Sequence, residues 1–338
     1  MKKGIIKRVL LIPGIWIVMM LAAATVYAAS QADFSDGEAA TKKYTISVYD
    51  KNGVEVQRII KKKNASFVTP SRKNAGGKTF LGWSVSPSGK SADYRAGQKI
   101  IVRRNMKLYP VYFNSIKEST VSWGSLPKLD LSKYKMVIFV GDSRTYRMGL
   151  RFESDRSTEI ITGVKFVGKG GAGLWWLKNI GYRELIKTIN LCNRENKSKK
   201  EIAVVFNLGV NDLICKNGKL VNTEIITDRY ASYMSKIKNS LIGKNCRLFY
   251  MSVNPTNCTM SKTKGLRKAK EIEEFNILLK KKISGQYQWI NCVDYLTRKG
   301  YAFDSGIKRE SGRDDGVHYT EATYQMIYRY CIQKINNS

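Results

Sequence analysis

Histidine is nearly absent from this chain. The 338 residues hold one copy, His318, in the stretch GRDDGVHYTEATY that begins at Gly312. A zinc site usually draws on several closely spaced His and Cys ligands, and the sequence also lacks a CxxC pair, so we expect no metal site. Imidazole changes charge near neutral pH, which makes a single copy a candidate for proton transfer as well as a chance feature of the surface.

Acidic residues are also scarce. The chain has 27 Asp plus Glu against 59 Lys plus Arg, which gives a formal net charge of +32. A field of this sign attracts polyanions such as nucleic acid, anionic lipid or anionic cell-wall polymer. Charge alone does not choose among these partners.

The N-terminus narrows the choice of partner. Residues 1–28 have a basic start, an apolar run from Val9 to Val26 and a small-x-small end, which predicts a secretory signal peptide cut after Ala28. The uncharged run is almost long enough to span a bilayer, so an uncleaved anchor is the alternative. Both interpretations place the rest of the chain outside the cytoplasm. We therefore expect a secreted or cell-surface protein that binds wall polymer or membrane surface, with no nucleic acid as partner.

Cysteine is missing from the first half of the chain. An even number of cysteines in an exported protein permits up to three disulfides, but the sequence does not give their connectivity. The six are Cys192, Cys215, Cys246, Cys258, Cys292 and Cys331.

A β-rich module is expected after a small, polar linker at 29–41. Short segments of 42–113 alternate apolar and polar residues, as strands do, and Asn52-Gly53 is a hairpin turn signal. The expected strands are YTISVYD, EVQRII, ASFVTP, KIIVRR and KLYPVYF. The part from FLGWS to LYPVYF resembles the Listeria–Bacteroides repeat in Gly82-Trp83, Tyr94, Gly97 and Leu108-Tyr109. That resemblance implies one β-grasp-like module of the kind associated with bacterial surface attachment.

The module is strongly basic. Residues 42–113 contain 16 basic and 3 acidic side chains, a net charge of +13. This charge predicts either a site for anionic wall or membrane polymer or simply a solvated basic face.

The pattern changes to α/β after a connector at 114–133. In 134–338, apolar strand segments alternate with helical stretches at about 173–195, 223–241 and 264–284, and a last helix follows Thr320. Alternation of this kind predicts a parallel sheet covered on both faces, here a flavodoxin-like three-layer α/β/α fold with five strands. The expected strands lie in MVIFVGDS, VKFVGKGG, IAVVFNLG, CRLFYMSVN and YQWINCVDY.

Polar residues follow several of these strands. Ser143, the glycines of 170–173, Asn211 and the pair Asp315 and His318 should meet at the carboxyl edge of the sheet, where ligands bind in such folds. Taken singly, each has a structural explanation as a helix cap or a turn residue.

Four blocks together resemble the SGNH or GDSL-type hydrolases. They are FVGDSRTYRMG, GKGGAGL, FNLGVND and DDGVHYT, in the family's order, and EIEEFNILLKKKI and INCVDYL resemble its penultimate helix and last strand. The resemblance implies a serine hydrolase that works without metal or cofactor. It assigns Ser143 as nucleophile, His318 as base and Asp315 as the acid that orients it, with Asp314 as an alternative.

The resemblance also implies an oxyanion hole. Its donors are the backbone amides of Ser143 and Gly173 and the side-chain amide of Asn211, with Gly171 as the alternative to Gly173. Arg144 stands where many relatives have an apolar residue, so we expect a basic group at the pocket. Trp175 and Trp176 either pack a helix or form a wall for sugar or acyl groups.

The expected function is ester hydrolysis, most plausibly removal of O-acyl (acetyl) groups from a cell-surface or extracellular glycan through an acyl-serine intermediate. One alternative is an O-acyltransferase that passes the acyl group to cell-wall glycan. The other is a non-catalytic wall-binding or adhesive surface protein. The triad is shared by the hydrolase and the transferase, so the sequence does not separate these two.

Overall fold

The computed structural model describes most of the chain from Lys42 onward, as nine ranges: 42–76, 78–89, 92–113, 119–155, 163–195, 200–214, 221–256, 269–304 and 316–338. The predicted signal peptide at 1–28 and linker at 29–41 lie outside these residues, as do Asp314 and Asp315. The predicted domain bounds stay predictions. Within the described ranges, no helix is both long enough and apolar enough to cross a membrane.

A five-stranded parallel sheet organises the C-terminal part of the chain, in the order β11-β10-β9-β7-β8. The predicted doubly wound α/β fold is therefore confirmed. The chain enters the sheet at the inner strand β7, adds β8 at the nearer edge and then adds β9, β10 and β11 on the other side of β7, so the topological switch point lies between β7 and β9. The strands are β7 Tyr134–Gly141, β8 Val164–Gly168, β9 Glu201–Asn207, β10 Cys246–Met251 and β11 Gln288–Ile290.

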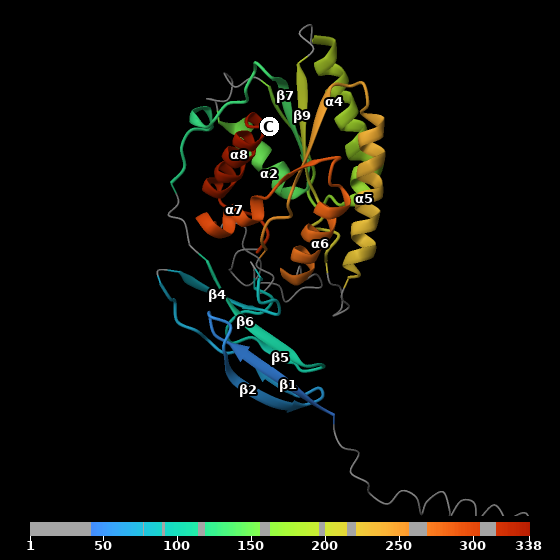
Figure 1. Cartoon of the computed structure of the whole chain (residues 1–338). Coiled ribbons are helices and arrows are strands. Elements are labelled where there is room, and N and C mark those ends of the chain that lie inside the picture. The colour runs from blue at the N-terminus through green and yellow to red at the C-terminus, as the bar shows by residue number, and fades with distance from the viewer. Residues whose placement is uncertain are drawn as a thin grey trace, which may run out of the picture. The chain divides into compact units, whose positions relative to one another are not determined.

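Two hydrophobic cores cover the two faces of this sheet. Alternate residues of each strand point to opposite faces, so Ile138 and Val204 enter one core while Val137 and Val205 enter the other. Figure 1 shows α4, α5 and α6 on one face and α2, α7 and α8 on the other. The helices are α2 Ser143–Ser154, α3 Leu174–Trp176, α4 Tyr182–Glu195, α5 Thr223–Ser240, α6 Ala269–Lys282, α7 Cys292–Lys299 and α8 Glu321–Asn336, with a π-turn at Leu177–Gly181 between α3 and α4.

The last predicted strand is shorter than expected. The apolar run from 287 to 295 forms strand only at β11, and the chain turns into α7 at Cys292. The Ser252 hydroxyl, after β10, accepts the Val293 N–H at 2.9 Å, and Asp294 lies in the first turn, where a negative charge favours a helix. These local interactions override the strand preference of the apolar run.

The N-terminal module is built from strands in its described residues. A four-stranded sheet has the order β2-β1-β6-β4, in which β1 is parallel and β4 antiparallel to β6, and β3 pairs with β5. β4 was not among the strands predicted from the sequence, and its Gly82 has φ +144° and no room for a Cβ against the Tyr94 carbonyl. The strands are β1 Lys43–Tyr49, β2 Glu55–Lys62, β3 Ser66–Val68, β4 Thr79–Ser84, β5 Lys99–Ile101 and β6 Met106–Phe113.

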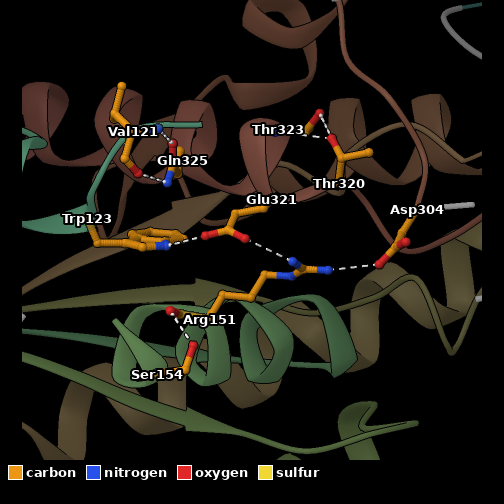
Figure 2. Close-up of polar contacts among 9 residues, drawn as sticks. All are labelled: Val121, Trp123, Arg151, Ser154, Asp304, Thr320, Glu321, Thr323 and Gln325. Atoms are coloured by element: carbon orange, nitrogen blue, oxygen red, sulfur yellow. Dashed lines mark hydrogen bonds and ion pairs between the residues drawn. The ribbon is translucent and has the colours of Figure 1, made fainter. Parts of the chain in front are cut away.

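Part of the predicted connector packs into the core around α8. A short 3-10 helix at Trp123–Ser125 places the Trp123 ring against Phe152 and Tyr328, and the ring is fully buried. The Trp123 indole N–H donates to Glu321 at 3.0 Å, and Glu321 is paired with Arg151 at 3.2 Å. Figure 2 shows how this line of contacts joins the connector, α8 and α2.

The cysteines of the described ranges are not cross-linked. Cys192, Cys246, Cys292 and Cys331 form no disulfide, and burial raises the pKa of each of the last three above the ordinary thiol value. Cys215 and Cys258 lie outside the described residues. The four thiols therefore take no part in the disulfides that the cysteine count permits.

Candidate active site

Ser143 is placed by the turn from β7 into α2. Gly141 ends the strand at a point where a Cβ would lie 2.1 Å from the Thr145 hydroxyl and 2.6 Å from the Asn207 carbonyl, so no larger residue fits. Asp142 caps α2, accepting the Arg144 N–H at 2.9 Å. Ser143 is thus the first residue of the helix, where backbone N–H groups have no partner within the helix and the dipole favours negative charge.

His318 reaches this serine from the other end of the sequence. Its Nε2 lies 2.8 Å from Ser143 Oγ, although 175 positions separate the two residues. The segment around His318 pairs with 302–304, because Asp304 donates its N–H to the His318 carbonyl and Thr320 donates its N–H to Ala302, both at 3.0 Å. The next residues begin α8, which Thr320 caps. The imidazole therefore extends from a short antiparallel pairing that ends at a helix.

The predicted glycine and asparagine blocks meet beside the serine strand. Asn211, after β9, donates from its side-chain amide to the Ala172 carbonyl at 2.8 Å. Gly173, the next residue, faces the carboxylate of Asp212 so closely that a Cβ would lie 2.6 Å from it. Gly171 instead occupies an exposed turn at φ +71°. The structure thus brings Gly173 to the Asn211–Asp212 segment and leaves Gly171 in the turn.

Asp212 holds the glycine block in place. Its carboxylate accepts the Leu174 N–H at 3.2 Å and the Tyr230 hydroxyl at 2.5 Å. Burial raises the pKa of Asp212, with the Tyr230 hydrogen bond opposing the shift, and burial raises the pKa of Tyr230 strongly. No role was predicted for Asp212 from the sequence, where its position in the FNLGVND block is the one signal that could have indicated it.

Arg144 does not border the pocket as the sequence led us to expect. Its side chain is 3% exposed and points into the protein, where it donates to three backbone carbonyls. Asn254 and Pro255, which supply two of these carbonyls, are buried as well. Trp175 and Trp176, predicted either to pack a helix or to form a wall of the site, differ in exposure. Trp176 is buried against Gly181, whereas Trp175 is 70% exposed.

Other predicted site residues remain without a position. Asp315 and its alternative Asp314 lie outside the described residues, so the third member of the predicted triad is not placed. Among the residues that are described, no group of three or more His, Cys, Asp or Glu side chains has a geometry suited to a metal ion.

Comparison with known protein families shows which family this chain matches. The GDSL-like Lipase/Acylhydrolase family matches residues 137–330 of this chain, more than half of its length. A search of the curated proteins gives no match.

Solved structures give distant similarities. The acetyl xylan esterase AlAXEase is 15% identical over 59% of this chain and 99% of its own, with a TM-score of 0.41. A GDSL-like lipase from Bacteroides thetaiotaomicron is 16% identical over 64% and 94%, with a TM-score of 0.42. The family match rests on the segment that contains the serine, glycine, asparagine and histidine blocks, and the chain therefore belongs to the GDSL-like lipase and acylhydrolase family, whose members are carboxylic ester hydrolases.

Proposed function

We propose that the protein is an exported serine esterase that removes O-acyl groups, acetyl in particular, from an extracytoplasmic glycan. The observation that carries the catalytic part is the 2.8 Å contact between Ser143 Oγ and His318 Nε2. A nucleophile within hydrogen-bond reach of a base is the arrangement that activates a serine hydroxyl, which is inert by itself.

Acylation follows from this contact. Ser143 Oγ attacks the ester carbonyl carbon while its proton passes to His318 Nε2, and the carbonyl oxygen becomes an oxyanion. Collapse of the intermediate breaks the carbon–oxygen bond to the sugar. The imidazolium then returns its proton from Nε2 to the departing sugar hydroxyl. The product of this half-reaction is an ester of Ser143.

Deacylation repeats the same steps with water. Neutral His318 takes a proton from water through Nε2 as the oxygen attacks the acyl carbon, and the proton finally returns to Ser143 Oγ. Nε2 can accept a proton only when the neutral imidazole carries its own proton on Nδ1. A carboxylate that accepts a hydrogen bond from Nδ1–H fixes this tautomer. Asp315, three residues before His318, is our candidate for that carboxylate.

Oxyanion stabilisation is assigned to donors beside the serine. The Ser143 N–H belongs to the first turn of α2, whose helix dipole favours the developing charge. We assign the other two donors to the Gly173 N–H and the Asn211 side chain. Gly173 is preferred to Gly171 because its block contacts Asn211 and Asp212.

The glycan part of the proposal rests on an exposed aromatic ring and on charge. Trp175 directly follows the block of Gly173 and Leu174 and is 70% exposed, although indole is costly to leave in water. Flat apolar rings of this kind stack on sugar faces. The basic module at 42–113 supports retention of the enzyme on anionic wall or membrane polymer.

A substrate screen tests the proposal. The purified protein and Ser143→Ala are compared on p-nitrophenyl esters of increasing acyl length and on acetylated glycans, with release of free carboxylic acid as the readout. We expect Ser143-dependent release, fastest from short acyl groups. Acyl transfer to an added sugar in place of acid release would favour the transferase, and the absence of both would refute the proposed function.

A further inference from the structure

Arg144, the residue after the predicted nucleophile, is a buried cation whose guanidinium donates to three backbone carbonyls of the described residues. Nε donates to Val317 at 3.0 Å, Nη1 donates to Asn254 at 2.9 Å and Nη2 donates to Pro255 at 3.2 Å. Burying a guanidinium is costly unless its donors are satisfied. A side chain held at this cost on a helix that begins at the nucleophile calls for a role beyond packing.

The guanidinium contacts both sequence neighbours of His318. Val317, on one side, accepts the bond from Nε, and the ring of Tyr319, on the other, lies under the guanidinium with 5.2 Å between Cζ and the ring centroid. Both neighbours are buried, at 7% and 0% exposed. Arg144 thus holds the Val317 carbonyl and the Tyr319 ring inside the protein, and His318, between these two residues, reaches Ser143 Oγ at 2.8 Å.

A third contact links Tyr319 to the segment after β10. The Tyr319 hydroxyl donates to the Pro255 carbonyl, which also accepts from Arg144. The segment after β10 and the segment of the histidine are thereby joined to each other as well as to α2. One side chain therefore ties the first turn of the serine helix to the residues on both sides of the base.

We propose that Arg144 is a positioning residue, which sets the Ser143–His318 distance by holding the backbone around His318. This inference rests on the proposed function, because it assigns the effect to the base of the esterase reaction. Arg144 itself touches no substrate, since it is buried. Its loss should reduce kcat and leave KM nearly unchanged, because small displacements of a catalytic group cost about a hundredfold in rate.

Two substitutions separate positioning from stability. Arg144→Met keeps most of the volume and removes charge and donors, whereas Arg144→Lys keeps the charge and replaces the planar fork with a point donor. We expect kcat to fall about a hundredfold in the first and about tenfold in the second, with KM within about twofold of the unsubstituted protein. Arg229→Met is the matched control, because it makes the same substitution at an exposed arginine of α5. It should keep kcat within about threefold.

The single histidine supplies a second readout that does not need activity. In ¹⁵N spectra of the purified protein, His318 should give two distinct ring-nitrogen signals, one protonated and one not, because its orientation fixes the tautomer. In either Arg144 variant these signals should move toward each other as both tautomers are sampled, and in Arg229→Met they should stay unchanged. If Arg144→Met does not fold, Arg144→Lys alone decides.

These experiments distinguish a failure of the positioning role of Arg144 from a failure of the proposed esterase function. An unsubstituted protein without Ser143-dependent esterase activity would refute that function, and the nitrogen spectra would still test the positioning. Unchanged kcat and an unchanged histidine spectrum in a folded Arg144 variant would overturn the inference. A rise in KM at constant kcat would also overturn it, since that result places Arg144 in substrate binding.

Discussion

The hydroxyl of Tyr230, on α5, donates a 2.5 Å hydrogen bond to the carboxylate of Asp212, in the segment after β9. The same carboxylate accepts the Leu174 N–H, next to the glycine that we assign to the oxyanion hole. A long helix on one face of the sheet thereby supports a loop at its carboxyl edge. The support is electrostatic, which makes it sensitive to protonation.

Stability should depend on the ionisation of Asp212. Because burial raises its folded-state pKa, the folded protein binds this proton more tightly than the unfolded chain does, and the free energy of unfolding contributed by Asp212 falls as pH rises. The fall begins near the unfolded carboxyl pKa of about 3.9 and ends above the raised value. Asp212→Asn cannot ionise. Urea unfolding between about pH 4 and 7 should show the unsubstituted protein losing stability relative to the variant across the acid part of this range, whereas a pH-independent difference would contradict the assignment.

Trp123 should be essential for stability although it lies in the predicted connector. Trp123→Ala removes a fully buried ring and should lower the free energy of unfolding by about 3–5 kcal/mol, measured by urea denaturation. Trp123→Phe loses mainly the hydrogen bond to Glu321 and should cost about 1–2 kcal/mol. Trp175→Ala is the matched control, and its exposed ring should change stability by no more than about 0.5 kcal/mol. Equal effects of the two alanine substitutions would refute the buried role of Trp123.

Trp175 should matter for polymeric substrates alone. If its ring stacks on sugar, Trp175→Ala should raise KM for an acetylated glycan about tenfold and leave kcat/KM for p-nitrophenyl acetate unchanged, because a flat group stacked on an aromatic ring, such as a nucleobase, gains about 1–3 kcal/mol. Trp175→Phe should recover part of the loss. Initial rates on both substrates provide the measurement, and equal losses on the two would assign Trp175 to the acyl pocket instead.

The basic module should retain the enzyme on anionic surfaces without contributing to the chemistry. A chain that begins at Asn114 keeps the residues that pack around Trp123 and should hydrolyse a p-nitrophenyl ester at the normal rate. It should bind isolated cell walls less well at low salt, and added salt should remove the difference by screening. Loss of small-ester activity would show that the module shapes the active site.

The full-length chain provides a control for total charge. Lys62→Glu with Lys63→Glu changes two exposed residues of the module, and Lys236→Glu with Lys281→Glu makes the same change of charge on exposed positions of α5 and α6. Co-sedimentation with cell walls should weaken much more for the first pair. Equal weakening would show that only the net charge matters.

The sequence predicted the sheet and the meeting of Ser143 with His318 because both depend on local patterns. Buried parallel strands are continuous apolar runs, and the residues that follow them share one edge by topology alone. Arg144 was placed wrongly because a cation next to an active serine suggests a position at the pocket. No local sequence pattern indicates that three backbone carbonyls from distant segments accept its hydrogen bonds. β4 was missed because Gly82, which its close approach to the Tyr94 carbonyl requires, interrupts the strand pattern.

The predicted connector shows a second limit of prediction from sequence. Trp123 lies in a polar stretch that resembles a linker, and its partners Phe152, Tyr328 and Glu321 come from α2 and α8, far along the chain. Contacts of such sequence separation leave no periodic signal. The same holds for Tyr230, whose partner Asp212 belongs to a different element.

In the proposed mechanism Ser143 forms the acyl intermediate with His318 as its base. Rapid mixing of the purified protein with p-nitrophenyl acetate, followed by acid quenching and peptide mass measurement, reveals which residue is acylated and how fast. We predict an acetyl group on the peptide of Ser143, with no modification in Ser143→Ala and, in folded His318→Ala, acylation slowed by at least about a thousandfold. Acetylation of another residue, or acetylation of Ser143 at an unchanged rate in His318→Ala, would refute the proposed mechanism.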